Sequence, residues 1–498
     1  MKTRGALLLI LLAALNPCLG AEKPNVIFFI VDDVSADDFG CYGNRAARTP
    51  HIDALAAGSL RFTSAYLTAS SCSPSRSSII TGRYPHNLGP GAELHGPVAG
   101  HIPWLPHFLQ KAGYYTALVG KNHMSREVLP PGSKDAVQPN PWNHTDKGVT
   151  PTNHSGGALW VQTLENRPKE KPFFFWFAAI DAHRGWDGDI EWDSALYGPK
   201  HRPEDVHVPP FLADTPATRA DLASHQNELT RFDHNVGQVV DALRKSGLLE
   251  NTLIFLLADN GRPFPRAKTR LHDSGMKTAL LAHWPAGTQA GSCSSLVSSI
   301  DLAPTVLEAA GLPGAPSMQG VSLRPLFANP AASVRSHAFS EHNWHDYEAH
   351  GRAIRDAGHL YIRNARPDLA WLGPVDSIQS PSHQDLIALR NQHRLDPAQA
   401  DLFLQPRPAE ELYDTEADPN QLHNLAANPA HAATRERLAR TLELWTQQTG
   451  DAVPESLRPD EYSRENGRAI QPKPTSDPRT RLPGSLRDAA HINHPGPR

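Results

Sequence analysis

Four strongly apolar runs, each followed by polar residues, constrain the fold of this chain more than any other feature. They cover residues 25–31, 114–119, 172–180 and 253–258. Runs of this length with so few polar residues are typical of parallel strands that are buried on both faces. Helical periodicity alternates with them: apolar residues recur at three- and four-residue steps from Leu229 to Leu243, and shorter helices are expected at 51–58 and 105–113. This alternation predicts an α/β fold with helices flanking the sheet.

Polar side chains stand at the carboxyl end of every run. They are Asp32-Asp33, Lys121-Asn122-His123, Asp181-Ala182-His183 and Asp259-Asn260-Gly261. Ligands of open α/β sheets bind beyond this edge. Any one of the clusters could be a solvated turn, but four together predict a shared site.

The pattern changes after about Pro325. Shorter strands are expected at residues 336–340, 353–363 and 411–414, followed by an amphipathic helix at 432–449. This predicts a small antiparallel sheet with a packed helix. We therefore divide the chain into a leader, a large N-terminal domain, a C-terminal subdomain and a Pro-rich tail that either wraps the surface or is disordered. Their ranges are 1–20, 21–328, 329–450 and 451–498.

The leader has the features of a signal peptide. Lys2 and Arg4 precede an apolar stretch at residues 7–15, which is too short to span a bilayer. Small residues occupy the usual cleavage offsets before Ala21. We expect export to the periplasm or the extracellular space, or a lysosomal destination in a eukaryote. Lipid attachment at Cys18 is an alternative, and no later apolar run is long enough to predict stable membrane insertion.

Cleavage would leave three cysteines, Cys41, Cys72 and Cys293. So few exclude a disulfide scaffold, and an odd number leaves at least one thiol unpaired or modified. All three could be buried free thiols.

The formal net charge of −4 argues against a nucleic-acid partner.

The segment that begins at Cys72 carries the most specific chemistry. Pro74 suits the first turn of a helix, which would place Cys72 at the helix N-terminus, where backbone N–H groups favour an anion. Arg76, one turn later, could reach the same anion. On these grounds alone, an ordinary capped helix with a buried thiol is an equal alternative.

Residues 72–83 read C-S-P-S-R-x-x-x-x-T-G-R. This segment resembles the signature of the type I sulfatases, and residues 24–33, 49–56 and 411–425 resemble further segments of that family. The resemblance runs from about residue 24 to 429. It implies an alkaline-phosphatase-like sulfatase fold, with a large, mostly parallel mixed sheet and a smaller antiparallel one. It also implies a sulfated glycan substrate, and a partner, either a formylglycine-generating or an anaerobic sulfatase-maturating enzyme, that converts Cys72 to formylglycine.

The resemblance also implies the residues of the site. Asp32, Asp33, Asp259 and Asn260, with residue 72, match the family's metal ligands, and a set of oxygen donors suits Ca²⁺. The implied catalytic residues are Cys72, Arg76, Lys121, His123, His183 and Lys268. Arg266 and Arg270 compete with Lys268 for the role of sulfate-binding cation. His342, His345 and Arg352 are candidates for the rim of the pocket.

The substrate is less constrained. The loop at residues 259–265 and the segment at 208–223 resemble the N-sulfoglucosamine sulfohydrolase (sulfamidase) branch, which implies hydrolysis of the N-sulfate of glucosamine in heparan-type sugars. Three alternatives stay open: an O-sulfatase acting on another sulfated polysaccharide, a phosphonate or phosphate monoester hydrolase of the same superfamily, and an inactive glycan-binding homologue.

Overall fold

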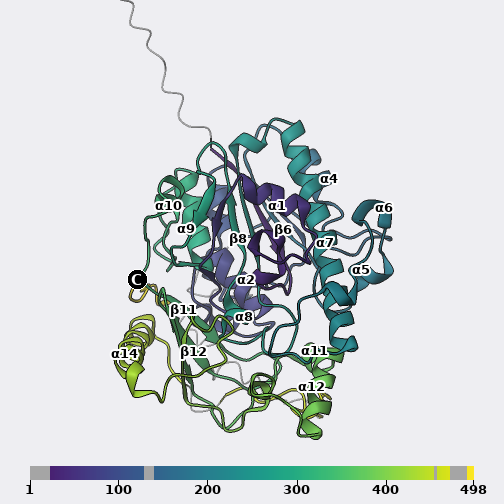
Figure 1. The fold of residues 1–498 in the computed structure, drawn as a ribbon. Coiled ribbons are helices and arrows are strands. Elements are labelled where there is room, and N and C mark those ends of the chain that lie inside the picture. The colour runs from purple at the N-terminus through teal and green to yellow at the C-terminus, as the bar shows by residue number, and fades with distance from the viewer. Residues whose placement is uncertain (1–22, 128–138, 454–456, 472–490) are drawn as a thin grey trace, which may run out of the picture.

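The computed structural model describes residues 23–127, 139–453, 457–471 and 491–498 (Figure 1). The predicted signal peptide at 1–20 lies outside the described residues. Within the described part, no helix combines the length and the apolar character needed to cross a membrane.

The larger sheet has eight strands in the order β5-β4-β6-β1-β7-β8-β2-β9. Its strands are β1 Asn25–Val31, β2 Leu60–Phe62, β4 Tyr115–Gly120, β5 His144–Asp146, β6 Phe173–Ala178, β7 Thr252–Ala258, β8 Leu280–His283 and β9 Gly291–Cys293. The five strands from β5 to β7 are mutually parallel, and β8 is antiparallel to both of its neighbours. All four predicted runs form adjacent strands, so the prediction of a mostly parallel mixed sheet is confirmed.

Helices cover both faces of this sheet (Figure 1). Successive β1 residues point to opposite faces, and all seven are buried. Phe28 belongs to the core formed with α2 Cys72–Thr81, α3 Leu105–Lys111, α9 Leu302–Ala309 and α10 Arg324–Ala328. Phe29 belongs to the opposite core, formed with α1 Pro50–Ala57, α4 Trp160–Asn166 and α7 Pro216–Lys245.

The helix predicted around Leu229–Leu243 is part of α7, which is much longer. It starts at Pro216, where the Thr215 side chain accepts a hydrogen bond from the Thr218 N–H and caps the helix. Further helices are α5 Asp187–Ile190, α6 Ser194–Tyr197, α8 Asp273–Met276, α11 Val375–Ile378, α12 Pro381–Asn391 and α13 Pro397–Ala400. A parallel pair, β3 Ala65–Tyr66 and β10 Val297–Ser298, completes this part of the fold.

The smaller sheet is antiparallel throughout, in the order β11-β12-β13-β14, as predicted. Its strands are β11 Ala338–His342, β12 Gly351–Arg355, β13 His359–Asn364 and β14 Glu410–Asp414. The prediction of a single strand at residues 353–363 is wrong. This segment forms the β12–β13 hairpin, because the Asp356 carboxylate accepts hydrogen bonds from the N–H groups of Gly358 and His359 and closes a turn.

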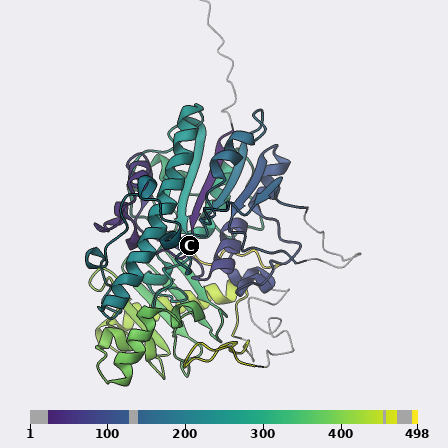
Figure 2. The ribbon, with the colours of Figure 1, turned by 90° about the vertical axis from the view of Figure 1, so that its right-hand side faces the viewer.

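Helix α14 Ala432–Thr449 packs on the smaller sheet through Leu438, Leu442 and Trp445 (Figure 2). The described parts of the tail contact the body of the protein. The Trp344 indole donates to the carbonyl of Pro459 at 3.0 Å, and Arg83 Nη2 donates to that of Ile492 at 2.6 Å. The division at residues 328 and 329 stays a prediction.

Candidate active site

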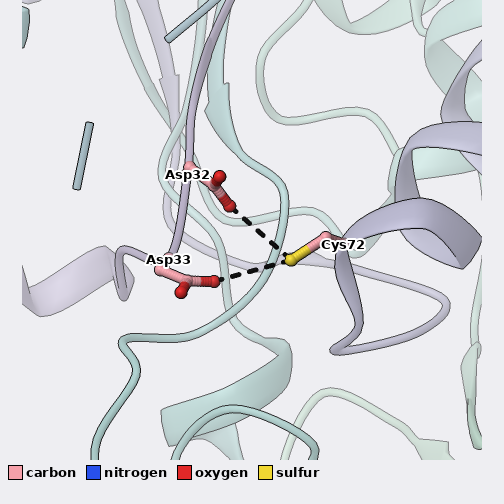
Figure 3. A group of neighbouring side chains, drawn as sticks. All are labelled: Asp32, Asp33 and Cys72. Atoms are coloured by element: carbon pink, nitrogen blue, oxygen red, sulfur yellow. Dashed lines mark hydrogen bonds between the residues drawn. The ribbon is translucent and has the colours of Figure 1, made fainter. Parts of the chain in front are cut away.

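The carboxyl-terminal edge of the larger sheet faces the first turn of α2, and the predicted site residues meet there. Asp32 and Asp33 follow β1, and Cys72 is the first residue of α2. The Cys72 Sγ lies 3.7 Å from one oxygen of Asp32 and 3.7 Å from one oxygen of Asp33 (Figure 3). The burial of Cys72 raises the pKa of its thiol well above the usual value, so the unmodified side chain is a poor nucleophile.

Three carboxylates and one amide oxygen are crowded into the same buried space. Asp32, Asp33 and Asp259 are fully buried. Asn260 Nδ2 donates to Asp33 Oδ1 at 2.5 Å, whereas Asn260 Oδ1 is buried and has no hydrogen-bond partner among the described residues. Unpaired oxygens and neighbouring carboxylates are costly in a protein interior unless a cation offsets them. This donor set fits a hard divalent cation such as Ca²⁺.

Three cationic side chains surround the carboxylates. Arg76 Nε donates to Asp259 Oδ2 at 2.7 Å, Lys268 Nζ donates to Asp33 Oδ2 at 2.8 Å, and Lys121 pairs with Asp32. Burial opposes ionisation of Asp32, but Lys121 and Arg76 together hold its pKa below the usual value. Burial raises the pKa of Asp259 to about 7. The arrangement can bind a cation and a tetrahedral oxyanion side by side.

Two histidines stand at the less buried side of the site. His183 Nε2 lies 4.0 Å from Asp33 Oδ2, and its side chain is 36% exposed. His123 Nε2 lies 2.8 Å from His95 Nδ1. Burial and the nearby Lys121 lower the pKa of His123 to about 2, so this imidazole carries no charge at neutral pH.

The geometry separates Lys268 from its two competitors. Lys268 points into the site, whereas Arg266 and Arg270 point away from it and pair with Asp401.

Among the proposed rim residues, His345 lies at the site, with Nδ1 2.7 Å from the Ser71 hydroxyl. The rim assignment of Arg352 is wrong, because its guanidinium is buried in an ion pair with Asp451 at 2.5 Å. His342 packs edge-on against Trp371.

Asp376, on α11, belongs to the site but was missed by the sequence analysis. Its Oδ2 lies 3.3 Å from Lys268 Nζ and 3.8 Å from His183 Nε2. Burial opposes its ionisation, but Lys268 lowers its pKa to about 2, so the group is a carboxylate at neutral pH. Asp376 follows no apolar strand, and no pattern in the sequence distinguishes it from other acidic residues.

Comparison with known proteins agrees with this geometry. Residues 24–312 match the family described as Sulfatase, and residues 266–366 match the one described as N-sulphoglucosamine sulphohydrolase, C-terminal. An ulvan-active sulfatase of Formosa agariphila is 29% identical over 93% of this chain and 81% of its own length. The N-sulphoglucosamine sulphohydrolase of Homo sapiens is 31% identical over 89% of this chain and 93% of its own.

A solved structure of a protein in complex with its substrate, D-glucosamine-2-N,6-O-disulfate, is similar to this chain with a TM-score of 0.62. The alignment covers 86% of this chain and 98% of that one, at 19% identity. At this identity the likeness shows the fold alone, and it agrees with the predicted fold class.

Proposed function

Because the chain belongs to the sulfatase family and is a sulfuric ester hydrolase, we propose that it releases sulfate from a sulfated glycan with residue 72 acting as formylglycine. The observation that carries this proposal is the position of Cys72. It stands at the N-terminus of α2, 3.7 Å from two carboxylates, with Arg76, Lys121 and Lys268 nearby. Its Sγ stands in for an oxygen of the hydrated aldehyde. A maturation enzyme, either formylglycine-generating or anaerobic sulfatase-maturating, would have to act on Cys72.

The side chains suit a two-step displacement at sulfur. One hydroxyl of the hydrated aldehyde passes its proton to a neighbouring carboxylate, Asp32 or Asp33, as its oxygen attacks sulfur. The bond from sulfur to the leaving oxygen or nitrogen breaks as His183 donates a proton to that atom. Neutral His123 then takes a proton from the second hydroxyl. The aldehyde re-forms and sulfate departs with the bonding electrons. Lys121, Lys268 and Arg76 offset the negative charge that the sulfate oxygens carry.

Asp32, Asp33, Asp259 and Asn260 would hold the cation, for which Ca²⁺ is the best fit. When bound, the ion supplies positive charge beside residue 72 and the sulfate. The observation that supports this assignment is that Asn260 Oδ1 is buried and has no hydrogen-bond partner within the part of the chain that the structure describes.

The N-sulfate of a terminal glucosamine is the proposed substrate. The loop at residues 259–265 supports it, since it starts with two proposed metal ligands and must border the reacting sulfate. Arg184 Nε donates to the Pro263 carbonyl at 2.8 Å, and the same guanidinium binds both oxygens of Asp221. These contacts hold the loop in place beside the site. An O-sulfate on another polysaccharide is the second candidate, since the ulvan-active relative matches over 93% of this chain.

The test joins mass spectrometry of the peptide that contains residue 72 to assays with defined sugars. We expect formylglycine at position 72, and Cys72→Ala should lose at least about four orders of magnitude in turnover. Sulfate release should be faster from an N-sulfated glucosamine disaccharide than from its 6-O- and 2-O-sulfated counterparts. Full activity in protein with unmodified Cys72 would contradict the mechanism. Cleavage of only the O-sulfated sugars would contradict the substrate alone.

A further inference from the structure

The carboxylate of Asp376 has no part in the two-step displacement, although it lies within the site. Its Oδ1 accepts a hydrogen bond from the Ser377 N–H at 2.7 Å. Its Oδ2 lies 3.3 Å from Lys268 Nζ and 3.8 Å from His183 Nε2. A carboxylate beside a sulfate-binding lysine weakens the attraction of that lysine for sulfate, so a separate role must account for its position.

Side-chain exposure shows which end of the site is open. The exposed fraction is 0% for Asp33 and 2% for Lys268, but 23% for Asp376 and 36% for His183. Sulfate bound among the buried cations would therefore leave the organic part of the substrate on the side of His183 and Asp376. Asp376 thus faces the leaving group rather than the sulfate.

The chemistry of the carboxylate limits what it can contact. An ionised carboxylate only accepts hydrogen bonds, and it repels sulfate oxygens. The groups of a sulfated sugar that can donate to it are ring hydroxyls and an amino nitrogen. Hydrogen bonds that involve one charged partner are worth more than those between neutral groups.

Asp376 is held on a fixed element. The Val375 N–H donates to Asp346 Oδ2 at 3.0 Å, and the Gln384 side-chain amide donates to the Ile378 carbonyl at 2.7 Å. Ile378 is fully buried in a core that also contains Phe264, from the loop at 259–265. Anchoring at both ends of α11 fixes the carboxylate relative to the proposed specificity loop.

We propose that Asp376 is a substrate-recognition residue, whose carboxylate accepts a hydrogen bond from a hydroxyl or amino group of the sugar that carries the sulfate. This inference rests on the proposed function and extends it from the sulfate to the leaving group. Asp376 comes from the part of the chain that follows the larger sheet, so this part would select the sugar while the larger sheet carries the chemistry.

The test compares sugars with a substrate that lacks such donors. Asp376→Ala should lower kcat/KM for N-sulfoglucosamine and glucosamine 6-sulfate by about ten- to hundredfold, mainly through KM. With 4-nitrophenyl sulfate the change should stay within about threefold. Asp385→Ala is the matched control, because that carboxylate lies on neighbouring α12 and binds the Thr215 hydroxyl. Asp385→Ala should leave kcat/KM unchanged for the sugars and for 4-nitrophenyl sulfate.

Equal losses on the sugars and on 4-nitrophenyl sulfate would overturn the proposal, because Asp376 would then only position Lys268 and His183. No loss on the sugars would overturn it as well. If the wild-type chain released no sulfate from either sugar, the proposed glucosamine substrate would be contradicted, independently of the role of Asp376. Equilibrium binding of the same sugars to Cys72→Ala, with and without Asp376→Ala, would then decide the role of Asp376: about tenfold weaker binding supports it, and equal binding overturns it.

Discussion

Asp401 joins the loop that carries Lys268 to the C-terminal part of the chain, and we predict that replacing it is strongly destabilising. Its Oδ2 lies 3.0 Å from Arg266 Nε and also pairs with Arg270, and its Oδ1 lies 2.9 Å from Arg407 Nη2. The three guanidiniums are at most 1% exposed. Asp401→Asn would leave these charges buried without that carboxylate.

Removing one partner from a buried ion pair costs about 3–5 kcal/mol. We expect the lower end, about 3 kcal/mol of unfolding free energy at neutral pH, because other acceptors remain. Arg270 keeps the Trp371 carbonyl at 2.8 Å, and Arg407 keeps Glu411 at 3.3 Å. KM for an aryl sulfate should rise too, because Arg266 and Arg270 flank Lys268.

Urea unfolding is the assay, with Asp368→Asn as the control. Asp368 pairs with Arg366 but is 60% exposed, so its replacement should change nothing measurable. Burial opposes ionisation of Asp401, but Arg270, Arg407 and Arg266 hold its pKa well below the usual value. The contribution of Asp401 to the free energy of unfolding should therefore be complete above about pH 4 and shrink as the pH falls further. A loss under about 1 kcal/mol at neutral pH would refute this reasoning.

Two further predictions concern the site. Asp259→Ala should lose the bound divalent cation and the activity together, as measured by elemental analysis and sulfate release; a fully active, metal-free preparation would contradict the metal assignment. His183→Ala should slow sulfate release from an N-sulfated sugar far more than from 4-nitrophenyl sulfate, because nitrophenolate can leave without a proton. Equal slowing of the two substrates would argue against His183 as the proton donor.

Strands and helices with strong periodicity could be predicted from the sequence because their burial pattern is local. The run at residues 25–31 coincides with β1, and the helix expected at 432–449 coincides with α14. The strand predicted at 353–363 failed because a side-chain turn at Asp356 interrupts it, and apolar content alone does not reveal such a turn.

The sequence by itself determined the sheet edge at which the site forms, since the carboxyl ends of parallel strands meet at one edge. It also determined which acidic and basic residues gather there after β1, β4, β6 and β7. Only the tertiary structure decided that Lys268, rather than Arg266 or Arg270, enters the site, because both arginines form ion pairs with Asp401 outside it. Only the tertiary structure brought in Asp376, which lies 108 residues from Lys268 in the chain. Contacts at such separations depend on how the two sheets pack, and no local pattern of residues encodes that packing.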